Sequence, residues 1–168
     1  NMAVLGEYYY AQECRPRNML YLTISTGVGG GVITEGRLYR GHRGGAGEIG
    51  HMVINPDEGA ICGCGRSGCL EALVSGTAIA RQAQELISSG RGRAIRECAG
   101  QDGRVTAREV GMAARRKDPE ACQIINGICR YLGIGIANLL NIFNPELVSL
   151  GGGVVLGMGD LIIPGTFA

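Results

Sequence analysis

One histidine and three cysteines lie close together in residues 47–71, GEIGHMVINPDEGAICGCGRSGCLE. Ten residues separate His51 from Cys62, one residue separates Cys62 from Cys64, and four separate Cys64 from Cys69. An imidazole with three thiolates is a donor set of tetrahedral zinc sites, and four protein ligands leave no position for a reactive water. The pattern therefore predicts a structural zinc ion. The alternative is a chance cluster of reduced loop cysteines, although such cysteines rarely fall at ligand spacing.

Two glutamates stand near the ends of this stretch. Glu48 precedes His51 by three residues, and Glu71 follows Cys69 by two. Folding of the loop around a metal ion would bring both carboxylates towards one place, where they could accept hydrogen bonds from a polyhydroxylated ligand. The alternative is that both are solvated surface glutamates. A zinc deaminase is excluded, because neither its His-x-Glu nor its Cys-x-x-Cys spacing occurs.

A glycine run, STGVGGG at residues 25–31, is the second candidate site. It lacks the Gly-Lys-Ser/Thr of a Walker A loop, and Val32 stands where the dinucleotide fingerprint needs a third spaced glycine. Thr26 offers a hydroxyl, and successive glycine amides can turn towards a phosphate without obstruction by side chains. The run therefore suits an anion. The alternative is a glycine-rich entry into a β-hairpin, or a bulge.

The elements that must position these residues alternate between strands and helices. Apolar Leu20, Leu22 and Ile24 alternate with polar residues before the glycine run, as in a half-buried strand. Residues 41–70 form a long irregular region, which is typical of a functional loop or of a loop held by other contacts. The predicted elements are a helix over 2–12, strands over 20–25, 32–34 and 37–40, helices that start at Ser75 or Thr77, at Thr106 and at Asp118, and a buried strand over 147–150 that ends at Gly151–Gly153. This order predicts an α/β fold.

The composition indicates one globular domain. The chain has 168 residues with a net charge of +1, which gives no reason to expect a nucleic-acid partner. Arginines near residues 91–96 and 115–117 are interpreted as solvated helix faces. Seven cysteines cannot all pair within one chain, and a reducing cytoplasm is favoured. The apolar stretch 124–143 is interrupted by Arg130 and three asparagines, so we interpret it as a buried helix and expect no membrane span.

Three segments together resemble the ROK family of sugar kinases and related repressors, particularly its bacterial glucokinases. They are YLTISTGVGGGVITEGRLYRGHRGGAGEIGH at 21–51, CGCGRSGCLEA at 62–72 and NIFNPELVSLGGGV at 141–154. The resemblance implies an actin-like, ribonuclease-H-like ATPase fold of two α/β lobes, with the sugar and ATP in the cleft between them. Residues 1–168 would then be a single partial domain, most of the larger C-terminal lobe, with a zinc-stapled loop.

The resemblance also implies roles for individual residues. The implied zinc ligands are His51, Cys62, Cys64 and Cys69, and the implied sugar contacts are Asn1, Glu48, His51 and Glu71. The implied phosphate loop contains Thr26, Gly27, Gly29, Gly30 and Gly31, and Gly151, Gly152 and Gly153 would lie near the adenosine. His51 would serve twice, with one ring nitrogen on zinc and the other towards a sugar hydroxyl. Zinc would thereby hold the sugar-binding side chains in register and take no part in the chemistry.

The function that the resemblance implies is ATP- and Mg2+-dependent phosphorylation of the 6-hydroxyl of glucose or a related hexose, by a cytoplasmic homodimer. Family members carry Asn-Asp-Ala-Asn before the helix that starts this chain, and Asn1 resembles the last residue of that motif. The aspartate that acts as general base is then expected two positions before residue 1. Both ends of the chain look cut, so residues 1–168 alone are expected to be inactive, because transfer also needs the other phosphate loop.

Three alternatives stay open. A ROK repressor shares the sugar and zinc regions but adds an N-terminal helix-turn-helix that binds nucleic acid. The substrate could be another hexose such as N-acetylmannosamine, fructose or allose, although Glu48 in GEIGHM favours the glucokinase branch. A zinc-stapled interaction module would make the glycine loops incidental. Retention of Thr26 and of the full glycine run favours ATP binding, and hence a kinase.

Overall fold

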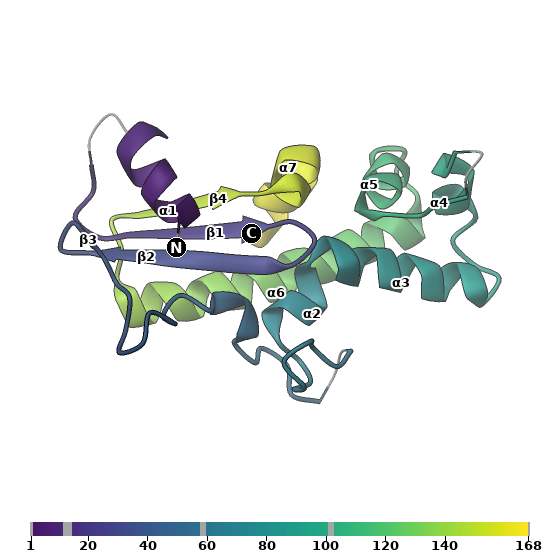
Figure 1. Ribbon diagram of the computed structural model, residues 1–168. Coiled ribbons are helices and arrows are strands. Elements are labelled where there is room, and N and C mark those ends of the chain that lie inside the picture. Colours follow the sequence, from purple (N-terminus) through teal and green to yellow (C-terminus); the bar gives the residue numbers. More distant parts are fainter. Residues whose placement is uncertain (1, 12–14, 58–59, 101–102, 168) are drawn as a thin grey trace.

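The computed structural model describes residues 2–11, 15–57, 60–100 and 103–167, which form a mixed α/β fold around a four-stranded sheet. The strands are β1 (Met19–Ile24), β2 (Val28–Thr34), β3 (Arg37–Leu38) and β4 (Leu147–Gly151), in the order β3-β2-β1-β4 (Figure 1). β2 runs antiparallel to β1 and β3, whereas β4 runs parallel to β1. The parallel pairing needs a long crossover, which the helical region between β3 and β4 supplies.

Helices pack on both faces of this sheet. They are α1 (Met2–Gly6) with a π-helical turn η1 (Glu7–Ala11), the 3-10 turn η2 (Ile49–His51), α2 (Leu70–Val74), α3 (Gly76–Ser88), α4 (Arg93–Cys98), α5 (Ala107–Arg115), α6 (Pro119–Phe143) and α7 (Gly153–Thr166). Alternate residues of β1 point to opposite faces. Leu20 and Leu22 join the main buried cluster with the apolar face of α6, and Met19 joins a smaller cluster with Val4 of α1.

The predicted starts of three helices are confirmed by hydrogen bonds from backbone amides to capping side chains. Ser75, and not Thr77, is the N-cap of α3. Thr106 and Glu109 form the predicted capping box of α5. Asp118 caps α6, because its carboxylate accepts from an amide in the first turn at 2.8 Å. These side chains satisfy amides that have no partner within the helix.

Several expectations were wrong in detail. The extended segment predicted from Val32 begins at Val28, because Gly29–Gly31 pair with β1 in the antiparallel ladder. The predicted 2–12 helix is helical from Met2 to Ala11, with the π-helical turn η1 as its second half, and residue 12 lies outside the described residues. Helices α2 and α4 were not predicted, since segments of five and six residues are too short to show a helical period. β4 was expected to be buried but is half-buried, because it is an edge strand with β1 as its only neighbouring strand among the described residues.

In the part of the chain that the structure describes, no helix combines the length and the apolar character that crossing a bilayer requires. The longest helix, α6, buries one face against the sheet and against its neighbouring helices. This agrees with the interpretation of residues 124–143 as a helix packed inside the protein.

Candidate functional site

The structure brings the four predicted metal ligands together. His51 ends η2, Cys69 lies directly before α2, and Cys62 and Cys64 lie in the loop between them. Their ligand atoms all lie within 4.8 Å of one another. Nδ1 of His51 is 3.4 Å from Sγ of Cys62, and the sulfur atoms of Cys64 and Cys69 are 3.6 Å apart. Residues that are up to 18 positions apart in the sequence thus lie close together in the structure.

These distances fit a tetrahedral zinc site. Bonds of about 2.3 Å to sulfur and about 2.0 Å to nitrogen place the ligand atoms of such a site about 3.5–3.8 Å from one another. Both separations given above lie close to this range. The three cysteines are free thiols, since a disulfide would require a sulfur separation of about 2.05 Å. The donor set and its spacing therefore fit the predicted ion.

The loop that carries two of the cysteines folds back on itself. Ile61 pairs with Ser67 in an isolated β-bridge, which closes the turn between them. Gly68 follows with a φ of 71°, and a Cβ atom there would lie 1.7 Å from the carbonyl oxygen of Asn55. Only glycine combines this backbone conformation with so close an approach, so Gly68 determines how Cys69 returns to the cluster.

The protein's own groups favour one thiolate in this cluster. The backbone amide of Arg66, and then its guanidinium, lower the pKa of the Cys64 thiol to about 6. Burial raises the pKa of the Cys69 thiol to about 12, and hydrogen bonds with Cys64 and Cys62 act in the same direction. Deprotonation of Cys69 therefore requires a cation in the cluster.

Three of the predicted sugar contacts lie around the cluster. Nε2 of His51 is 4.0 Å from a carboxylate oxygen of Glu48, while Nδ1 faces Cys62. The Glu48 side chain is 73% exposed and therefore open to a ligand. Glu71 accepts hydrogen bonds from the Val28 amide at 3.0 Å and from the Cys62 thiol at 3.6 Å. Glu71 thus joins the cysteine loop to the turn between β1 and β2.

A cavity of about 360 Å³ lies beside Glu71. Its lining comes from the β1–β2 turn, the cysteine loop and helices α2 and α3, and it includes Thr26, Gly27, Cys62 and Glu71. Glu48 and His51 do not line it. The predicted sugar contact Asn1 lies outside the described residues.

A second cavity, of about 420 Å³, also borders Thr26. The first residues of α7 form one wall, including Gly153. Of the predicted nucleotide contacts, Thr26 and Gly153 therefore share a cavity, while Gly27 lines the cavity beside Glu71. The other predicted contacts do not line either cavity: Gly29, Gly30 and Gly31 lie in β2, Gly151 ends β4, and Gly152 caps α7.

Sequence analysis missed several residues that line this second cavity. They include Thr77, Arg104, Thr106, Arg108, Arg115 and Met158. Thr106 was recognised only as a helix cap, and Arg115 was interpreted as part of a solvated face. Arg115 is exposed, as that interpretation expects, but its pairing with Asp160 and its place at the cavity were not predicted. Only its place in the fold, beside α7, gives this arginine a position at the cavity.

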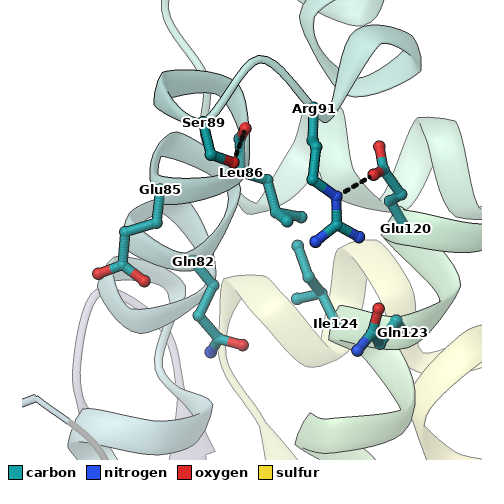
Figure 2. A pocket seen from close by; sticks show the side chains of 8 residues that line it. All are labelled: Gln82, Glu85, Leu86, Ser89, Arg91, Glu120, Gln123 and Ile124. Atoms are coloured by element: carbon teal, nitrogen blue, oxygen red, sulfur yellow. Dashed lines mark hydrogen bonds and ion pairs between the residues drawn. The ribbon is translucent and has the colours of Figure 1, made fainter.

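A third cavity, of about 410 Å³, lies between α3 and the start of α6, away from these residues. Figure 2 shows its side chains, with an ion pair of 2.7 Å between Arg91 and Glu120 at one side. Its lining contains none of the predicted metal, sugar or nucleotide contacts. We therefore place the candidate functional site at the first two cavities and at the cysteine cluster.

The chain is similar to known proteins in sequence and in structure. A glucokinase from Halalkalibacterium halodurans is 41% identical over 164 residues, covering 98% of this chain and 50% of the relative. The structure of a ROK family glucokinase from Streptomyces griseus in complex with glucose and AMPPNP matches with a TM-score of 0.85 and 32% identity, covering 99% of this chain and 54% of that one. A ROK hexokinase from Thermus thermophilus matches with a TM-score of 0.80 and 38% identity, covering 98% of this chain and 53% of the other.

N-acetylmannosamine kinases and a xylose repressor are also among the proteins that the chain resembles. The chain spans about half the length of the curated kinases that it matches. The family model with the description ROK family matches residues 1–161. With nearly the whole chain inside that match and the same fold in solved members, the protein belongs to the ROK family.

Proposed function

We propose that this chain is the sugar- and nucleotide-binding part of an ATP-dependent kinase that phosphorylates the 6-hydroxyl of glucose or a related hexose. The observation that carries the proposal is that Thr26 lines both cavities. Phosphoryl transfer requires the terminal phosphate of the donor and the acceptor hydroxyl to meet in line at one point. The hydroxyl of Thr26 would bind the phosphate at the junction of the two cavities.

The sugar would be held beside the cysteine cluster. With Nδ1 of His51 on the metal side, the ring proton lies at Nε2 and can be donated to a sugar hydroxyl. The carboxylates of Glu48 and Glu71 would accept hydrogen bonds from further hydroxyls, which lose water when the sugar binds. His51, Cys62, Cys64 and Cys69 would hold Zn2+, which would supply a fixed centre for these side chains and would not take part in the chemistry.

The nucleotide would occupy the cavity of about 420 Å³. Helix α7 begins at Gly153 in its wall, and the amides of a helix N-terminus favour anionic ligand atoms. Arg104 and Arg108 add positive charge to the lining. Mg2+ that accompanies ATP supplies neutralisation of the phosphate charge during transfer.

The relatives are about twice as long as this chain, and the rest of their length would hold the other parts that a kinase needs. Because the chain covers about half of each kinase that it matches, we propose that residues 1–168 are one partial domain of a longer protein. We assign no general base to residues 1–168 and propose that the base, the other phosphate loop and the second lobe come from the rest of that protein. The bound glucose and AMPPNP in the Streptomyces griseus glucokinase support the assignment of the two ligands.

A sugar-responsive repressor is the second candidate, because a xylose repressor from Caldicellulosiruptor bescii is 34% identical over 151 residues. Kinases and repressors differ in the step that comes after sugar binding. A repressor has no need to bring a phosphate donor to the sugar, whereas two cavities that share Thr26 serve that purpose. The lining that the two cavities share, Thr26 and Thr77, therefore favours a kinase.

The test is a coupled assay of the full-length protein with ATP, Mg2+ and a panel of glucose, N-acetylmannosamine, fructose, allose and xylose. We expect phosphorylation of glucose, and Glu71→Gln should raise the KM for glucose about tenfold or more, because a charge-assisted hydrogen bond is lost. Glu97→Gln on α4 is the control and should leave KM unchanged. Sugar binding without phosphorylation of any member of the panel would favour the repressor and contradict the proposal.

A further inference from the structure

Arg115, the last residue of α5, joins two parts of helix α7. That helix is interrupted at Met158, whose φ of −139° and ψ of 18° are not helical. Before the break, the carbonyl of Gly157 accepts a hydrogen bond from Nη2 of Arg115 at 2.7 Å. After it, the two carboxylate oxygens of Asp160 accept from Nε and Nη2 at 2.9 and 2.6 Å. One guanidinium group therefore spans the break.

A packing contact also joins α5 to α7, one helical turn before Arg115. A Cβ atom at Gly111 of α5 would lie 2.6 Å from the sulfur of Met158, so α5 and α7 approach closely there. Met158 itself is only 3% exposed. Gly111 and Arg115 are four residues apart and share one face of α5. This face holds the break in α7 through one apolar contact and one polar clamp.

The segment before the break, Gly153–Gly157, forms a wall of the cavity of about 420 Å³. It has glycine at both ends, and glycine is among the weakest helix formers. Its local sequence therefore does little to fix its conformation. Contacts with the rest of the protein must set its position, and the contacts to Arg115 act at the end of the segment.

We propose that Arg115 is a positioning residue for the nucleotide: by clamping Gly157 and Asp160 it fixes the first segment of α7 and hence the shape of the cavity wall. This inference rests on the proposed function, in which that cavity binds ATP. The planar guanidinium suits the task, because it can bind a carboxylate through two nitrogens while also reaching a carbonyl, whereas a lysine ammonium acts as a single point charge.

The ion pair between Arg115 and Asp160 can be removed by mutation without unfolding the protein. The side chains of Arg115 and Asp160 are 42% and 56% exposed, and pairs with this exposure contribute little to the free energy of unfolding. The hydrogen bond from Arg115 also lowers the pKa of Asp160, so this carboxyl group stays ionised at neutral pH. A matched control exists on α4, where Arg93 pairs with Glu97 at 2.7 Å and does not line the cavity.

The experiment compares Arg115→Lys, Asp160→Ala and the control Arg93→Lys in the full-length protein. Arg115→Lys and Asp160→Ala should each raise the KM for ATP about three- to fivefold, the upper range for loss of an exposed ion pair, with kcat and the KM for glucose within about twofold of wild type. Hydrogen exchange of the amides of residues 153–158 should become faster in both variants. Arg93→Lys should match the wild type in every measurement.

Three results would overturn the inference. Loss of ATP affinity in Arg115→Lys but not in Asp160→Ala would mean that Arg115 contacts the nucleotide directly. Unchanged KM and exchange in both variants would mean that the first segment of α7 is held by other contacts. A parallel loss in ATP, glucose and kcat would mean a general structural role. In each case the wild type would still use ATP, whereas failure of the wild type to bind ATP would contradict the proposed function itself.

Discussion

His51 faces in two directions, and this orientation connects the two kinds of chemistry in the site. Nδ1 lies 3.4 Å from a cysteine sulfur, and Nε2 lies 4.0 Å from the carboxylate of Glu48. A metal ion at the first nitrogen fixes the proton on the second. In the proposed function, a metal ion on Nδ1 would therefore make Nε2 of His51 a fixed hydrogen-bond donor to the sugar.

Gly68 offers a residue-level test of how the cysteine loop is built. Gly68→Ala should lower the free energy of unfolding by about 2–4 kcal/mol, because the new Cβ atom would meet the carbonyl of Asn55 at a positive φ. Gly45→Ala in the same irregular region is the control, since no atom lies near the new Cβ, and its effect should stay within about 0.5 kcal/mol. Urea unfolding measures both values. Equal effects of the two substitutions would show that the loop does not depend on this close approach.

At this scale the sequence predicted the donors better than their neighbours. Spacing was enough to select the histidine and three cysteines, because ligands within one loop need only local turns to meet. The hydrogen bond from the Val28 amide to Glu71 was not predictable, since it joins segments 43 residues apart. The same holds for Arg115, whose partner Asp160 lies 45 residues away. Such contacts depend on how helices pack, and no local pattern records them.

Helix α6 is the element that organises the interior, and its start depends on Asp118. Asp118→Ala should lower the free energy of unfolding by about 1 kcal/mol, because the amide of Ala121 loses its acceptor, whereas Asp118→Asn keeps an acceptor and should cost only a few tenths. Thermal or urea unfolding of the two variants gives the comparison. A loss of the same size in both would show that the charge of Asp118, and not the cap, is what stabilises the helix.

Glu120 connects the start of α6 to the turn between α3 and α4. Its carboxylate accepts from the amide of Gly92 at 2.6 Å. It also pairs with Arg91 at 2.7 Å, as Figure 2 shows. These two partners, the amide first, lower the pKa of Glu120. A carboxyl group whose pKa is lower in the folded state stabilises the protein at neutral pH, and this contribution is lost as the pH falls from the unfolded value of about 4.3 through the folded value.

The difference in unfolding free energy between wild type and Glu120→Gln should therefore be largest near pH 7 and should shrink as the pH falls below about 4. Urea unfolding at a series of pH values measures it. A difference that stays constant over this range would mean that hydrogen-bond geometry, and not charge, accounts for the contribution of Glu120.

At the scale of elements, the long helices and their caps were predictable because α3, α5 and α6 begin with strong capping side chains. Helix α4 lacked this signal, since its N-cap Gly92 has no side chain to accept a hydrogen bond. The glycine run was the ambiguous case. Its pattern allowed both a phosphate loop and a hairpin entry, and the structure contains a tight turn at Thr26 and Gly27 followed by a glycine-rich strand.

The topology of the whole molecule explains why the two cavities meet. β1 and β4 are parallel neighbours, so their carboxyl ends lie at the same edge of the sheet. The β1–β2 turn with Thr26 follows one strand, and the start of α7 at Gly153 follows the other. Ligands of open α/β sheets bind beyond the carboxyl ends of such strands. The sequence predicted both glycine segments, and the parallel pairing brings Thr26 of the first and Gly153 of the second to one cavity.

The central claim is that one metal ion holds the side chains that bind the sugar. The most direct measurement is crystallographic, with anomalous scattering at the zinc edge from crystals of the full-length protein soaked with glucose. We predict a single zinc peak about 2.3 Å from the three cysteine sulfurs and about 2.0 Å from Nδ1 of His51, with a glucose hydroxyl hydrogen-bonded to Nε2. A cluster without anomalous signal, or glucose bound away from His51, Glu48 and Glu71, would contradict the claim.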